Sequence, residues 1–137
     1  MATAGHSGPD RTPPDRREGF SLRARLRSFA WAWAGGRVLV RGQHNAWIHG
    51  AATLLVLLLG LACRVSRLEW AVLGLAVGLV WAMEALNTAI ELLADEVCLE
   101  RRERIGQAKD VAAFGVLAAA LAAMVVGVLV FWPYLFN

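Results

Sequence analysis

The sequence predicts an all-α integral membrane protein with three transmembrane helices preceded by an amphipathic helix on the cytoplasmic surface. Hydrophobic residues make up 58% of only 137 residues, which is more than a chain this short hides in one soluble core. They gather in three long runs, each close to the roughly 20 residues that a helix needs to cross a bilayer. We expect the spans at about 46–63, 70–95 and 110–132.

The segment before the first span divides into two parts. Residues 1–19 are polar and rich in proline, and we expect a disordered tail, followed by one membrane domain over residues 20–137. In residues 20–41, arginines recur along one helical stripe and large apolar side chains along its neighbour. This pattern is typical of a helix that lies in the membrane interface. It fits a simple surface anchor as well as a direct role in binding a substrate.

Basic residues predict the orientation. Of the 14 lysines and arginines, only Arg64 and Arg67 lie between the first and second spans. The positive-inside rule therefore puts the N-terminus and the loop at 97–109 in the cytoplasm. Since no folded basic module remains outside the spans, nucleic acid is not an expected partner.

The second span ends in a polar stripe. At 100° per residue its polar side chains all lie within about 60° of Glu84; they are Glu84, Asn87, Thr88, Glu91 and Asp95. Glu84 would lie about 21 Å along this helix from its expected start at Trp70. Because a carboxylate at mid-depth costs at least ~2.5 kcal/mol, such residues usually face a partner, a cavity or a pathway.

Two interpretations of the stripe remain open. Its polar groups would simply bind neighbouring helices together, although adhesion does not require three carboxylates. Alternatively, the deeper Glu84 accepts a proton and the shallower carboxylates bind a hard cation such as Mg²⁺. That division suits phosphoryl transfer to a lipid hydroxyl, with Lys109 as a positive counterpart for phosphates. The chain has no Walker A sequence or kinase glycine-rich loop, which excludes the common soluble kinases.

The run 84–91 (Glu-Ala-Leu-Asn-Thr-Ala-Ile-Glu), followed by Asp95 and by Ala-Lys-Asp at 108–110, closely resembles the prokaryotic diacylglycerol kinase and undecaprenol kinase family. The resemblance covers about 28–132. It implies a homotrimer in the bacterial inner membrane that uses MgATP to phosphorylate a lipid alcohol, either diacylglycerol or undecaprenol. The segment 45–49 leans toward the undecaprenol type.

The resemblance also implies roles for single residues. It makes Glu84 the catalytic base and Asn87 its polar partner. Nucleotide contacts are implied for Glu91, Glu100, Lys109 and Asp110. Contacts with the lipid substrate are implied for Glu84, Asn45 and His49.

The implied metal site combines Glu91 with Gln43. Family members normally carry a glutamate at the position of Gln43, and no acidic residue occurs between Glu18 and Glu69. A neutral amide would complete a hydrated Mg²⁺ sphere more weakly than a carboxylate. The alternative function is therefore a weakened or inactive family member, or a small non-enzymatic membrane oligomer with a polar seam.

Overall fold

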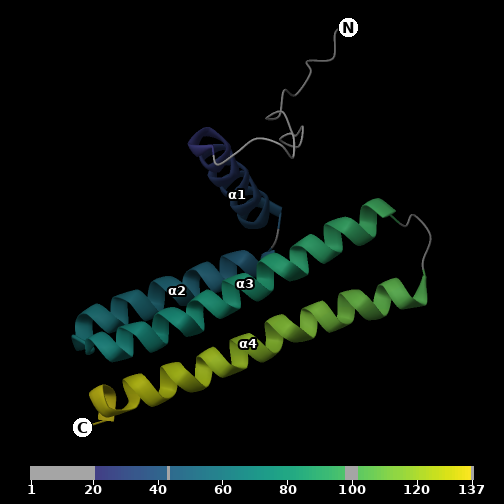
Figure 1. Ribbon diagram of the computed structural model, residues 1–137. Coiled ribbons are helices and arrows are strands. Elements are labelled where there is room, and N and C mark those ends of the chain that lie inside the picture. The colour runs from purple at the N-terminus through teal and green to yellow at the C-terminus, as the bar shows by residue number, and fades with distance from the viewer. Residues whose placement is uncertain (1–20, 43, 98–101, 137) are drawn as a thin grey trace, which may run out of the picture. The chain divides into compact units, whose positions relative to one another are not determined.

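The computed structural model describes residues 21–42, 44–97 and 102–136. Within them the regular secondary structure is all α-helix, as expected, with α1 over Leu22–Gly42, α2 over His44–Cys63, α3 over Arg67–Val97 and α4 over Glu103–Phe136 (Figure 1). Of the described helices, α2, α3 and α4 are long and apolar enough to cross a membrane. The expectation of three transmembrane helices is thus supported by their length and composition.

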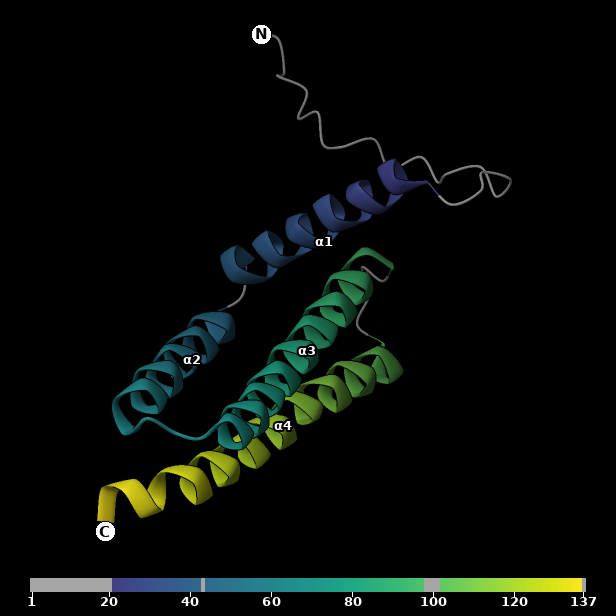
Figure 2. The same ribbon diagram turned by 60° about the vertical axis from the view of Figure 1, so that its left-hand side comes forward.

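Helices α2, α3 and α4 form a three-helix bundle. Helix α3 packs along α4, and α2 contacts both of them; Figure 2 shows α4 returning antiparallel to α3. Large apolar side chains cover the outside of the bundle, and Leu68 and Leu75 are 76% and 75% exposed. So much exposed apolar surface is unusual for a protein in water and suits a surface that faces lipid.

Helix α1 is continuous through Gly35 and Gly36. Its large apolar side chains are exposed, with Phe29 and Trp33 each at 73%. Its placement on the membrane surface stays a prediction.

A short turn joins α2 to α3. The N–H of Val65 donates to Gly60 O at 3.1 Å and that of Arg64 to Leu61 O at 3.3 Å, which is the Schellman pattern of a helix C-terminus. Arg64 takes the left-handed conformation that this pattern requires, with φ of 53°. Ser66 and Glu69 then form a capping box, because each side chain accepts a hydrogen bond from the other's backbone N–H, at 3.3 and 2.6 Å.

An apolar cluster holds this end of the bundle together. Val65, Leu73 and Phe131 are its buried residues. Trp70 packs against Gly60 so closely that a Cβ there would meet its ring at 2.6 Å. The polar stripe of α3 lies toward the opposite end of the helix, where α4 begins.

Candidate functional site

Part of the polar stripe of α3 is buried inside the bundle. Glu84 has no exposed surface, and Asn87 and Thr88 are each 5% exposed. Within the described residues, both carboxylate oxygens of Glu84 lack a hydrogen-bond partner, as do Asn87 Oδ1 and Thr88 Oγ1. A buried polar group left unsatisfied costs about 1–3 kcal/mol. The buried part of the stripe therefore contains polar atoms whose missing hydrogen bonds cost stability.

His49 of α2 is the neighbour of Glu84 across the helix interface. Its Nε2 lies 3.7 Å from Glu84 Oε2, and its side chain is 14% exposed. The distance is longer than a hydrogen bond but within ion-pair range. His49 therefore has one side near the buried carboxylate and another in contact with the space beside it.

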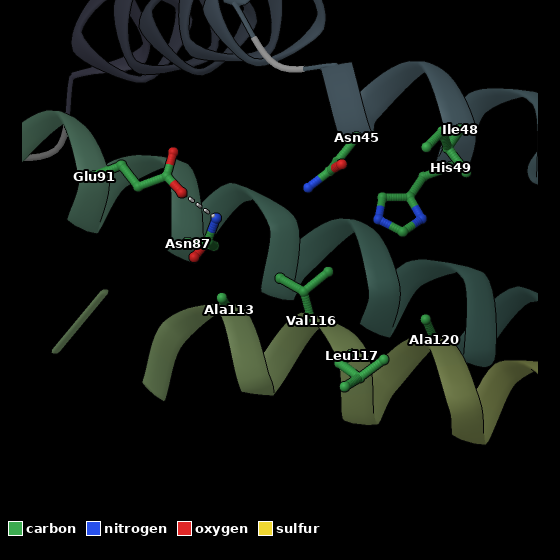
Figure 3. A pocket seen from close by; sticks show the side chains of 9 residues that line it. All are labelled: Asn45, Ile48, His49, Asn87, Glu91, Ala113, Val116, Leu117 and Ala120. Atoms are coloured by element: carbon green, nitrogen blue, oxygen red, sulfur yellow. Dashed lines mark hydrogen bonds between the residues drawn. The ribbon is translucent and has the colours of Figure 1, made fainter. Parts of the chain in front are cut away.

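That space is a pocket of about 280 Å³ between α2, α3 and α4 (Figure 3). Asn45 and His49 line it from α2, and Asn87 and Glu91 from α3. Asn87 Nδ2 donates to Glu91 Oε1 at 2.9 Å, and Figure 3 shows the two side chains pointing toward one another. Small or apolar side chains of α4 form the remaining wall, namely Ala113, Val116, Leu117 and Ala120. The pocket thus combines a polar rim from two helices with an apolar base from the third.

Two of the predicted nucleotide residues, Lys109 and Asp110, lie outside this pocket. Lys109 of α4 donates to Asp95 of α3, with Nζ 3.0 Å from Oδ1. Asp110 follows Lys109 and is exposed. Neither Lys109 nor Asp110 lines the pocket that holds Glu91. The ion pair ties the ends of α3 and α4 together and places a cation next to the stripe's last carboxylate.

The donors fit a sparsely held Mg²⁺ ion better than a protein-enclosed metal. No group of three His, Cys, Asp or Glu side chains that could hold a metal occurs in residues 21–42, 44–97 and 102–136. Mg²⁺ is commonly held by one or two carboxylates, with substrate phosphates and waters completing its shell. Glu91, with amide oxygens on the same pocket, provides a donor set of that kind. Two predicted residues, Gln43 for the metal and Glu100 for the nucleotide, lie outside the described residues.

Two residues beside the site were not expected from the sequence. Trp81 Nε1 donates to Thr53 Oγ1 at 3.0 Å, and Thr53 Oγ1 donates to His49 O at 2.7 Å. The available clue was spacing, because Thr53 follows His49 by one helical turn and Trp81 precedes Glu84 by three residues. That spacing is common in apolar helices and carries no specific prediction.

Comparison with known proteins gives a family match. The model of the family described as prokaryotic diacylglycerol kinase matches residues 30–131. This range includes α2 and α3 completely, together with most of α4.

Individual relatives cover most of the chain. An undecaprenol kinase of Bacillus subtilis is 34% identical over 110 residues, which is 80% of this chain and 89% of the relative. A diacylglycerol kinase of Synechocystis sp. is 33% identical over 133 residues, covering 96% and 76% of the two chains. A diacylglycerol kinase of Escherichia coli is 28% identical over 123 residues, covering 85% and 93%.

Proposed function

This chain belongs to the prokaryotic diacylglycerol kinase family, and we propose that it transfers the γ-phosphate of ATP to the hydroxyl of a membrane lipid alcohol. The family and the three long apolar helices make it a multi-pass membrane protein of lipid kinase type. The proposal adds the phosphate donor, the acceptor and the residues that act on them.

The observation that carries the proposal is the buried Glu84 carboxylate. Both of its oxygens are unsatisfied within the described residues, and it lies beside His49, which lines the polar pocket. A general base needs a free lone pair and a position close to the proton that it takes. Glu84 meets the first requirement, and its approach to His49 supports the second.

In the proposed reaction the lipid hydroxyl oxygen forms a bond to the γ-phosphorus of ATP. The bond from that phosphorus to the oxygen bridging the β- and γ-phosphates breaks, and ADP leaves. The hydroxyl proton passes to the carboxylate of Glu84. Asn45 and His49 would hold the hydroxyl end of the lipid, with Asn87 orienting the polar groups around it.

The remaining polar residues would bind MgATP. Mg²⁺, when bound, would neutralise phosphate charge, and Glu91 is the described residue best suited to hold it. Lys109 would exchange its partner Asp95 for phosphate oxygens, and Asp110 is exposed at the same end of α4 for a contact with the nucleotide. Binding MgATP would thus bring together groups that lie in two separate places.

We further propose a homotrimer in the bacterial inner membrane, with the N-terminus and the α3–α4 connection in the cytoplasm. The orientation rests on the distribution of arginines. The acceptor is diacylglycerol or undecaprenol, since relatives named for each are similar to this chain over most of its length. A slight lean toward undecaprenol rests on the segment 45–49.

The deciding experiment is a phosphate-transfer assay on the purified protein with MgATP, testing diacylglycerol and undecaprenol side by side. We expect transfer to at least one lipid and a loss of at least about a hundredfold in Glu84→Gln. Glu69→Gln, the same change elsewhere on α3, is the matched control and should keep its activity. If neither lipid is phosphorylated, the chain is an inactive member or a non-enzymatic oligomer.

A further inference from the structure

His49 is linked to two residues that the proposed reaction does not use, Thr53 by a hydrogen bond and Trp81 by a ring contact. One turn along α2, the Thr53 hydroxyl donates to the carbonyl of His49 at 2.7 Å. From α3, the Trp81 indole donates to that same hydroxyl at 3.0 Å. The three residues therefore form one hydrogen-bonded unit that spans the interface between α2 and α3.

The direction of these hydrogen bonds follows from the chemistry of the hydroxyl. A threonine hydroxyl has a single proton, and here it is directed to the backbone oxygen of His49. Its lone pair is then left to accept from Trp81, whose indole nitrogen is a donor only. A buried indole N–H usually finds such a partner. The pair therefore fixes the rotation of the Trp81 ring.

That fixed ring lies against the imidazole of His49. The two ring centroids are 6.5 Å apart and the planes meet at 67°, the edge-to-face arrangement that aromatic pairs favour. Trp81 and Glu84 lie three residues apart on α3, and side chains at this spacing share a helix face. His49 consequently has Trp81 at one edge of its ring and the Glu84 carboxylate near Nε2.

The orientation of the His49 ring matters because of its distance from Glu84. At 3.7 Å from Nε2 to Oε2, the pair is just beyond hydrogen-bonding distance. A small rotation of the imidazole either closes or widens that gap. Contacts that limit the rotation of the imidazole therefore help to keep His49 and Glu84 close enough to act on the same hydroxyl group.

We propose that Trp81 and Thr53 are positioning residues that hold the His49 ring in register with Glu84. This inference rests on the proposed function, since it assumes that His49 and Glu84 meet the lipid hydroxyl. Neither Trp81 nor Thr53 lines the pocket that contains Asn45 and Glu91. Their effect is on the geometry of the transfer step and not on nucleotide binding.

Kinetics of three variants and one control variant test the proposal. Thr53→Val removes the hydroxyl at nearly constant volume, and Trp81→Phe keeps an aromatic ring but removes the N–H. Both should lower kcat by about tenfold to a hundredfold and leave the KM for MgATP unchanged. Thr53→Ser keeps the hydroxyl and should restore most of the rate. Trp132→Phe, a matched change at an exposed tryptophan, should have no effect.

Combined variants separate positioning from simple packing. In a His49→Gln background, Thr53→Val and Trp81→Phe should cause no additional loss of kcat, because the ring that they orient is gone. A full additional loss in that background would overturn the proposal. So would a KM for MgATP that rises in proportion as kcat falls.

A readout that does not need activity separates this inference from the proposed function. In protein carrying ¹⁵N-labelled histidine, Thr53→Val and Trp81→Phe should shift the ring-nitrogen NMR signals of His49, assigned by their disappearance in His49→Gln. Trp132→Phe should leave them in place. Unchanged His49 signals in both variants would overturn the inference even if the protein is an active kinase. Shifted signals in a protein without activity would support the inference and contradict the proposed function.

Discussion

Two glutamates of α3, Glu69 in its first turn and Glu84 near its middle, differ in how their carboxylates are satisfied. Glu69 accepts hydrogen bonds from the Ser66 N–H at 2.6 Å and the Tyr134 hydroxyl at 2.9 Å. Glu84 is completely buried, and neither of its oxygens has a hydrogen-bond partner in the described residues. The Glu69 carboxylate is bonded at the start of the helix, whereas the desolvated Glu84 carboxylate makes no hydrogen bond in the described residues. The proposed function gives the same residue type on one helix two different purposes.

The packing of the bundle also differs between the region of Glu69 and the region of Glu84. The end around the α2–α3 turn is filled by Val65, Leu73 and Phe131. Near the polar end, small residues of α4 such as Ala113 and Ala120 face the stripe and leave a pocket. We interpret the first region as the one that fixes the hairpin and the second as the one that binds ligands.

Replacing Glu84 by leucine should have the largest effect. Lipid phosphorylation should fall by at least about a hundredfold because the base is gone. The melting temperature in detergent should rise, since a buried carboxylate without a hydrogen bond is exchanged for an apolar side chain of similar size. An activity assay and a thermal melt on the same preparation measure both.

The control for this variant is Glu69→Leu, which removes the bonded carboxylate. It should keep the kinase rate and lower the melting temperature, because the capping box and the Tyr134 contact are lost. If Glu84→Leu also melts at a lower temperature, Glu84 has structural partners beyond the described residues and the contrast between the two glutamates fails.

Gly60→Ala tests the packing at the end of the bundle around the α2–α3 turn, which we call the structural end. Its Cβ would lie 2.6 Å from the Trp70 ring, so the indole must shift, at a cost of about 1–3 kcal/mol in unfolding free energy. The rate per folded molecule should not change, because the clash is remote from the polar pocket. Gly74→Ala is the matched control, since a Cβ there meets no atom within 4 Å. Equal melting temperatures for the two variants would contradict the expected packing.

Helical periodicity explains what was predictable. It assigns Glu84, Asn87 and Thr88 to one face from their numbers alone, and the structure buries all three. The approach of His49 to Glu84 was not predictable in this way, because it depends on how α2 is rotated against α3. That rotation results from packing between helices, and hydropathy within one helix does not specify it.

The α2–α3 turn shows a second limit. Helix α3 begins at Arg67, before the span expected at 70–95, because Ser66 and Glu69 cap it. The left-handed position of the turn is occupied by Arg64, and not by the glycine that usually marks such a position. Without that glycine the sequence gives no direct indication of the turn type.

Gln43→Glu should have a more modest effect, on the Mg²⁺ dependence of the activity. The change supplies the acidic residue that the resemblance implies at this position, and a second carboxylate strengthens Mg²⁺ binding. The Mg²⁺ concentration for half-maximal activity should fall by about tenfold, or about 1.4 kcal/mol. Gln107→Glu adds the same charge on α4, outside the pocket, and serves as control. An unchanged Mg²⁺ titration would mean that position 43 does not act on the metal.

Tyr134→Phe should have the smallest effect and tests whether the structural end is independent of the site. It removes the hydroxyl that joins α4 to Glu69 while keeping the ring. Because the contact is exposed, water replaces the lost hydrogen bond, and the melting temperature should fall less than in Glu69→Leu. Activity with either lipid should equal that of the parent. A fall in kcat would show that the α2–α3 turn and the polar pocket are coupled along α3 and α4, and the division between the two ends would then have to be abandoned.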